Sequence, residues 1–131
     1  MNQIGARLKP QHFRICHNAS HANCLPLNTM NYILFDDSRE KLLPLTFTRP
    51  VCDLRIGILT IREKWESYLK VSTSTLTEDY LKVKFPLVSA SENVFINGSV
   101  CPTNELVAAI TSLTEGDRLV KNGKLLAVRV V

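Results

Sequence analysis

Apolar and polar residues follow one another along the chain in blocks that predict alternating strands and helices. The run 31–35, NYILF, is a short apolar segment followed by two aspartates, as expected of a buried strand that ends in a turn. The run 93–96, NVFI, predicts a second strand. RLVKNGKLLAVRVV at 118–131 predicts a hairpin, because Asn122-Gly123 tolerates the positive φ of a tight turn.

Two segments have the period of amphipathic helices. The segment 58–69 predicts the stronger helix, with Trp65 as a core anchor. Its expected inward face consists of Ile58, Ile61, Trp65, Tyr68 and Leu69. A second helix is expected from Asn104 through about Leu113. Between the two helices, 72–77 predicts a polar loop, and Thr77 is expected to cap a short helix over 78–83.

This alternation favours an α/β layer structure. About four strands are expected, fewer than a doubly wound sheet usually has. The prediction is therefore an incomplete sheet with flanking helices and a C-terminal hairpin. The last strand is expected to leave an open edge, at which a second copy of the chain or a partner would pair.

Composition and charge exclude several classes. A chain of 131 residues with 45% apolar residues is expected to form one domain with a real core. Thirteen of the 16 basic residues and all 12 acidic ones lie from Met30 onward, so this body is nearly neutral and not a nucleic-acid-binding domain. No run reaches the roughly 18 apolar residues of a membrane span. We expect a soluble, cytoplasmic chain without a secretory signal.

Residues 1–29 contain no acidic residue and no sustained apolar period, and are expected to be a disordered extension. A zinc site is the alternative, because four ligand-type residues lie close together: His12, Cys16, His21 and Cys24. Their spacing matches no common zinc finger, so free thiols are the expected state of the cysteines. A strand is expected directly after Met30, which suggests Met30 as the natural start.

The loop after the first strand, FDDSREKLLPLTFTRP at 35–50, contains the candidate chemistry. Open α/β sheets bind ligands at the carboxyl ends of their strands. Arg39 and Arg49 flank the loop, and guanidinium groups suit phosphate oxygens because they donate in pairs. Pro44 and Pro50 stiffen the path between them. The loop is thus a candidate anion site, the alternative being solvated loop arginines.

The same residues resemble the signature of sugar-1-phosphate nucleotidyltransferases, G-x-G-T-R-x-x-P-L-T-x-x-x-P-K-P. Ser38-Arg39 falls on its Thr-Arg, Pro44-Leu45-Thr46 on its P-L-T, and Arg49-Pro50 on its final Lys-Pro. Six segments resemble the N-terminal part of a bacterial variant, the N-acetylglucosamine-1-phosphate uridyltransferase-like proteins: NYILFDD, LLPLTFTRPV, DLRIGILTIREKW, TEDYL, INGS and EGDRLVKNGKLLAVR. The resemblance covers residues 30–131.

The resemblance implies a partial Rossmann-like nucleotidyltransferase domain with a nucleoside triphosphate and a sugar 1-phosphate as substrates, and Mg²⁺ as cofactor. The most specific version is transfer of UMP from UTP to N-acetylglucosamine 1-phosphate with release of pyrophosphate. Arg39 would contact the β- and γ-phosphates, and Arg49 the α-phosphate or the attacking phosphate. The implied nucleotide-binding residues are Phe35, Asp36, Asp37, Ser38, Arg39 and Thr46.

The sequence departs from the signature where its glycines are replaced by Asp36 and Asp37. These carboxylates would bind Mg²⁺ indirectly, accept from a nucleobase, or cap the turn. The family's metal-binding aspartate has no counterpart before Val131, so we expect no turnover by this chain alone. The rival reading is a stand-alone nucleotide-sensing or protein-interaction module.

Overall fold

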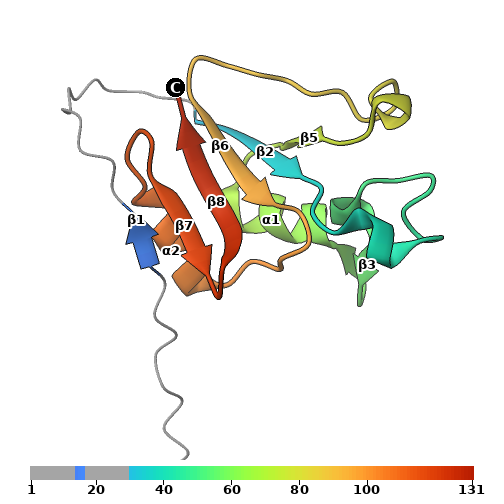
Figure 1. Ribbon diagram of the computed structural model, residues 1–131, viewed down its shortest axis with the longest axis horizontal. Helices are drawn as coiled ribbons and strands as arrows, with labels where there is room; N and C mark the ends of the chain where they lie inside the picture. The colour runs from blue at the N-terminus through green and yellow to red at the C-terminus, as the bar shows by residue number, and fades with distance from the viewer. Residues whose placement is uncertain (1–13, 17–29) are drawn as a thin grey trace, which may run out of the picture.

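A computed structural model of the chain describes residues 14–16 and 30–131, which form a mixed sheet with two α-helices behind it (Figure 1). Across the sheet the strands lie in the order β1-β7-β8-β6-β2-β5. β2 pairs in parallel with both β5 and β6, and the other pairs are antiparallel. The six strands are β1 (Arg14–Cys16), β2 (Asn31–Phe35), β5 (Ser74–Leu76), β6 (Asn93–Asn97), β7 (Arg118–Lys121) and β8 (Lys124–Val130).

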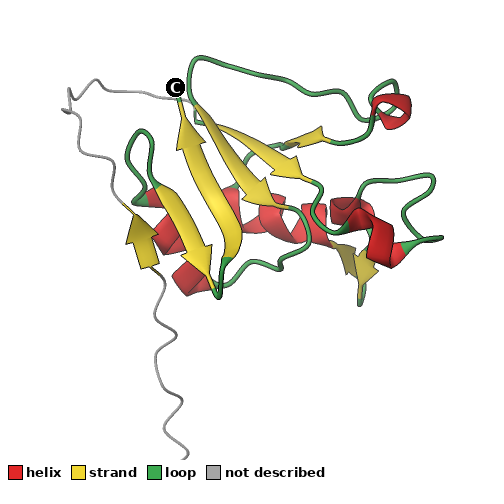
Figure 2. Cartoon of the chain, viewed as in Figure 1, coloured by secondary structure: helices red, strands yellow, loops and turns green. Residues whose placement is uncertain are grey.

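The remaining elements connect these strands, as Figure 2 shows by colour. They are the α-helices α1 (Ile61–Leu69) and α2 (Asn104–Thr111), the 3-10 turns η1 (Arg39–Leu42), η2 (Val51–Asp53) and η3 (Asp79–Leu81), and a two-stranded ribbon of β3 (Arg55–Ile56) and β4 (Leu59–Thr60). Because β2, β5 and β6 are parallel, their carboxyl ends meet at one edge of the sheet. The turn between β7 and β8 lies at the same edge, since β8 runs against β6.

The core fills the space between the sheet and the two helices. Trp65 is fully buried in it, and its indole Nε1 donates to the carbonyl oxygen of Val100 at 2.8 Å, so the expected core anchor is confirmed. Leu34 of β2 and Ile96 of β6 belong to the same buried cluster. Ile110 of α2 closes it. Burial of these side chains stabilises the fold by removing apolar surface from water.

The opposite face of the sheet carries no helix among the described residues (Figure 1). An irregularity in the β7–β8 pairing changes what β8 presents there: Leu119 pairs with Ala127, but Val120 pairs with Leu125. One residue of β8 is thereby unpaired, and both Leu126 and Ala127 lie in the core. Leu125 and Val128 consequently line a pocket on the other face.

The strands expected at 31–35 and 93–96 and the hairpin are confirmed. Asn122 and Gly123 have φ of 52° and 75°, as the tight turn requires. Further strands were not expected. β5 lies where a polar loop was predicted over 72–77, because pairing with β2 rather than an apolar pattern makes it a strand. β1, which pairs with β7, lies in the segment 1–29, where no element was expected.

Three local predictions were wrong. Tyr68, expected on the inward face of the first helix, is 45% exposed. This helix begins at Ile61 rather than at Ile58, which lies in the β3–β4 turn and is 86% exposed. A capping box causes this: the Thr60 hydroxyl accepts from the Glu63 N–H, and the Glu63 carboxylate accepts from the Thr60 N–H. The turn at 79–81 is a 3-10 turn without a side-chain cap, and Thr77 bonds elsewhere.

The predicted open edge at the last strand was also wrong. β8 pairs with β6 on one side and with β7 on the other, so it is interior to the sheet. The expected pairing of a partner along this strand is therefore excluded.

Cys52 and Cys101 are free thiols. The zinc hypothesis rests on side chains that lie outside the described residues. None of the described helices is long and apolar enough to cross a membrane.

Candidate functional site

The loop 36–50 leaves the carboxyl end of β2 and is closed on itself by Asp36. One carboxylate oxygen of Asp36 accepts from the backbone N–H of Val51 at 2.8 Å, and the other accepts from the Thr77 hydroxyl. The two ends of the loop and the end of β5 are thus joined at one side chain. The Asp36 side chain is only 9% exposed, so these bonds are shielded from water. Three roles were considered for the two aspartates: binding Mg²⁺ indirectly, accepting from a nucleobase, or capping the turn. In this structure the bonds of Asp36 are structural, because they hold the loop closed.

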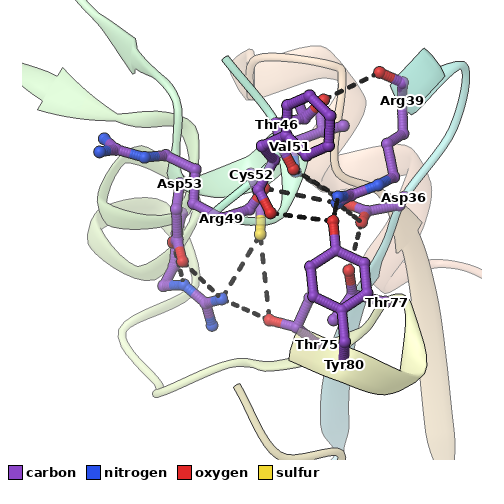
Figure 3. A network of polar contacts seen from close by, with 12 residues as sticks. Asp36, Arg39, Thr46, Arg49, Val51, Cys52, Asp53, Thr75, Thr77 and Tyr80 are labelled. Atoms are coloured by element: carbon purple, nitrogen blue, oxygen red, sulfur yellow. Dashed lines mark hydrogen bonds and ion pairs between the residues drawn. The ribbon is translucent and has the colours of Figure 1, made fainter. Parts of the chain in front are cut away.

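Arg39 lies inside the loop, with its side chain 10% exposed (Figure 3). Its Nη1 lies 3.5 Å from the Asp36 carboxylate and donates to the Arg49 carbonyl oxygen at 3.4 Å. Its Nη2 donates to the carbonyl oxygen of Thr46 and to the hydroxyl of Tyr80. The guanidinium that was expected to contact phosphates therefore bonds to its own loop in this conformation.

Thr46 and Tyr80 complete this closure. Thr46 is fully buried, and its hydroxyl donates to the Arg39 carbonyl oxygen at 3.0 Å. The Tyr80 hydroxyl donates to the Phe47 carbonyl oxygen at 2.8 Å, so the η3 turn holds the far side of the loop. A loop without glycine is thereby kept in one shape by side-chain bonds to backbone carbonyls. In the sequence Tyr80 belonged to the TEDYL segment of the resemblance, but it was assigned no role.

Arg49 differs from Arg39 in its surroundings. Its side chain is exposed, and no residue of the described part of the chain holds it in a hydrogen bond or ion pair. Pro50 follows and is buried, so the backbone that carries Arg49 is anchored. A guanidinium on an anchored backbone at the ligand-binding edge of the sheet suits an anionic ligand.

Behind the loop, Arg62 of α1 connects the helix to the sheet. Its Nε donates to Asp53 at 2.6 Å, and its Nη1 donates to the Thr73 carbonyl oxygen at 3.1 Å. Its Nη2 reaches the hydroxyl of Thr75 and the sulfur of Cys52 (Figure 3). Burial raises the pKa of the Cys52 thiol to about 12, so this sulfur stays protonated and acts as a packing group.

Asp37 points to the other side, toward the β7–β8 hairpin. Its Oδ2 accepts from the side-chain amide of Asn97 at 2.9 Å and lies 3.0 Å from the ammonium group of Lys124. These bonds, the one from Asn97 first, hold the pKa of Asp37 below its usual value, so the carboxylate is ionised at neutral pH. Ser38, the next residue, donates to its Oδ1 at 3.2 Å and turns the chain with a φ of 55°.

Asp37, Asn97, Ser99 and Lys124 form a cluster of polar side chains, which the buried Asn97 holds together. Its amide group donates to Asp37 and to the Leu125 carbonyl oxygen, each at 2.9 Å. Its carbonyl oxygen accepts from the N–H and the hydroxyl of Ser99, at 3.0 and 2.6 Å. Lys124 also donates to that hydroxyl at 3.2 Å. In the sequence Asn97 and Ser99 belong to the INGS segment of the resemblance, without an assigned role, and nothing in the chain order linked Asn97 to Lys124.

A pocket of about 260 Å³ lies beside these polar groups on the face of the sheet without helices. Its walls are mainly apolar: Phe35, Leu76, Phe95, Leu125 and Val128, together with Asp36. Phe35, a predicted nucleotide-binding residue, thus borders a space of the chemical character that suits a flat ring. The pocket and the polar cluster are adjacent along the chain, because Asp37 follows Asp36 and Lys124 precedes Leu125.

The described residues do not make a magnesium site by themselves. Mg²⁺ needs one or two carboxylates in addition to substrate phosphates. Asp36 is taken up by the loop, and Asp37 is paired with Lys124. Within residues 30–131 no group of three or more histidine, cysteine, aspartate or glutamate side chains is placed to hold a metal ion.

Comparison with known proteins adds one finding. The family model described as "Sugar nucleotidyl transferase" matches residues 32–131. The match therefore includes the loop 36–50 and the cluster of polar side chains around Asn97. No curated protein and no solved structure matched the chain. The family match covers more than half of the chain, and it begins in β2, the strand that carries the loop. The chain therefore belongs to the sugar nucleotidyl transferase family.

Proposed function

We propose that this chain binds a nucleoside triphosphate and a sugar 1-phosphate at the carboxyl edge of β2 and β6, as part of a nucleotidyltransferase. In the specific form, the substrates are UTP and N-acetylglucosamine 1-phosphate. A phosphate oxygen of the sugar phosphate attacks the α-phosphorus, the new P–O bond forms, and pyrophosphate leaves. The observation that carries the proposal is the anchored, exposed Arg49 on a loop that the family match includes.

The two arginines have different roles in this proposal. Arg49 contacts a phosphate of the substrate, because its guanidinium is exposed and held by no described residue. Arg39 is a positioning residue, because its donors go to carbonyl oxygens of the loop and to Tyr80. Rigid placement of Arg49 lowers the entropic cost of binding and aligns the phosphate for attack.

Phe35 and the pocket beside it are proposed to take the base, with Asp36 at the rim. A flat uracil ring fits against an aromatic and aliphatic wall. The backbone from Asp36 to Ser38 would then border the sugar and phosphates of the nucleotide. Mg²⁺, which the family typically uses, would neutralise phosphate charge when bound. The described residues do not form a site for it by themselves.

The test is calorimetric titration of the chain with UTP in the presence of Mg²⁺, and separately with N-acetylglucosamine 1-phosphate. Saturable binding that Arg49→Ala weakens about tenfold, the loss of one charge-assisted bond, supports the proposal. Arg55→Ala is the control, since Arg55 is an exposed arginine on the β3–β4 ribbon. No saturable binding of either ligand by the native chain would overturn it.

A further inference from the structure

The cluster of Asp37, Asn97, Ser99 and Lys124 uses other bonds than those by which Asp36 and Arg39 hold the loop 36–50 closed, although Asp37 itself belongs to that loop. It joins the ends of three strands: Asp37 follows β2, Asn97 ends β6 and Lys124 begins β8. Each of the four hydrogen-bonding positions of the Asn97 side chain is used. Asn97 is therefore held rigidly, and it places Asp37 in a fixed orientation.

Asp37 and Lys124 retain surface toward solvent. The Asp37 side chain is 30% exposed and that of Lys124 is 46% exposed. Asp37 uses Oδ2 for Asn97 and Lys124, whereas among the described residues its Oδ1 accepts only from Ser38. Lys124 has three ammonium hydrogens, and its two partners within the described part of the chain are Asp37 and Ser99. An acceptor and a donor thus lie next to each other at the ligand-binding edge.

The charge of this cluster decides which ligand it fits. One carboxylate and one ammonium group give no net charge, and a phosphate placed at Asp37 would meet the repulsion of an ionised carboxylate. A hydroxyl group both donates and accepts. Two vicinal hydroxyls match the pair, because one donates to the Asp37 carboxylate while the other accepts from Lys124.

The position beside the pocket agrees with such a ligand. Leu125 lines the pocket, and its carbonyl oxygen accepts from Asn97. Phe35 lines the same pocket two residues before Asp37. A ligand with a flat or apolar part in the pocket would therefore bring a neighbouring ring with hydroxyls toward Asp37 and Lys124.

We propose that Asp37 and Lys124, oriented by Asn97 and Ser99, form a subsite for a vicinal diol. The inference rests on the proposed function, since the diol comes either from the ribose of the nucleotide or from the sugar ring of the sugar phosphate. Both sources offer the same chemistry to the cluster. The phosphate groups are bound elsewhere, at Arg49.

The experiment compares Asp37→Ala and Lys124→Ala with the native chain by calorimetric titration with three ligands: UTP, 2′,3′-dideoxyuridine triphosphate and N-acetylglucosamine 1-phosphate. Lys82→Ala is the matched control, because Lys82 is also 46% exposed and also paired with an aspartate, Asp79. Urea denaturation of each variant verifies that it is folded. Lys124→Gln retains a donor and should recover part of the affinity.

If the ribose supplies the diol, both variants weaken UTP about tenfold or more and leave the dideoxy analogue unchanged. If the sugar ring supplies it, they weaken N-acetylglucosamine 1-phosphate and leave UTP unchanged. Equal weakening of UTP and its dideoxy analogue would assign the cluster to phosphate and overturn the inference. Unchanged binding of all ligands would overturn it too, with the proposed function intact. A native chain that binds none of them would overturn both.

Discussion

The carboxylate of Asp36, at the end of β2, accepts a hydrogen bond at 2.8 Å from the backbone N–H of Val51, which begins η2. This bond spans the loop that carries Arg39 and Arg49. A short polar side chain thus closes a loop that contains no glycine. The neighbouring Asp37 points to Asn97 and Lys124 instead, so the two adjacent aspartates have different bonding partners.

Asp36→Ala is expected to lower the free energy of unfolding by about 2–3 kcal/mol, because it leaves the Val51 N–H without its acceptor and the largely buried Arg39 guanidinium without its carboxylate partner. Urea denaturation followed by Trp65 fluorescence measures the change. Asp79→Ala is the control and should leave stability unchanged, since the Asp79 side chain is 94% exposed. Equal effects of the two substitutions would contradict the closing role of Asp36.

Arg39→Ala and Arg49→Ala should differ in kind. Arg39→Ala is expected to lower stability by about 2 kcal/mol and to weaken nucleotide binding with it, because it opens the loop. Arg49→Ala should weaken binding about tenfold with stability unchanged within about 0.5 kcal/mol. Denaturation and calorimetric titration of both variants test this. Loss of binding without loss of stability in Arg39→Ala would instead return Arg39 to direct phosphate contact.

Gly98→Ala is expected to destabilise the chain by about 1–3 kcal/mol. An added Cβ would lie 3.0 Å from the Phe35 carbonyl oxygen and 3.2 Å from the Cys52 Cβ. The carbonyl cannot move away freely, because it accepts from the Gly98 N–H at 2.8 Å. Thermal denaturation measures the loss. In Gly57→Ala the added Cβ meets nothing within 4 Å, so only its φ of 80° should matter there.

Cys52 should resist thiol reagents at pH 8 in the folded protein, while Cys101, which is partly exposed, should react. Labelling followed by peptide mass spectrometry distinguishes the two. Rapid labelling of Cys52 under native conditions would contradict its burial.

The raised pKa of the Cys52 thiol should make the stability of the protein depend on pH. The unfolded chain loses the Cys52 proton above about pH 8.5, whereas the folded chain keeps it until pH about 12. The stability of the native chain relative to Cys52→Ala should therefore fall by about 1.4 kcal/mol per pH unit above about pH 8.5. Denaturation of both proteins at pH 8.0 and 9.5 measures this difference. A difference that does not change with pH would mean that water reaches the thiol in the folded state.

The sequence by itself determined the elements whose signal is local. β2 and β6 followed from apolar runs, the hairpin from Asn122-Gly123, and the burial of Ile61 and Trp65 in α1 from its period. It also located the loop 36–50, because the residues that form it are contiguous. The start of α1 was missed although its signal is local, since the capping box of Thr60 and Glu63 lies within the apolar pattern.

Only the tertiary structure decided what depends on contacts between distant residues. β5 is a strand because β2 pairs with it, and β8 is interior because β6 and β7 flank it. Arg39 and Arg49 look alike in the sequence, yet Arg39 bonds to carbonyl oxygens of its own loop and the side chain of Arg49 is exposed. Asp37 and Lys124 are far apart in the chain and meet because the parallel and antiparallel strands bring their ends to one edge. Such pairings follow from sheet order, which no local pattern of side chains encodes.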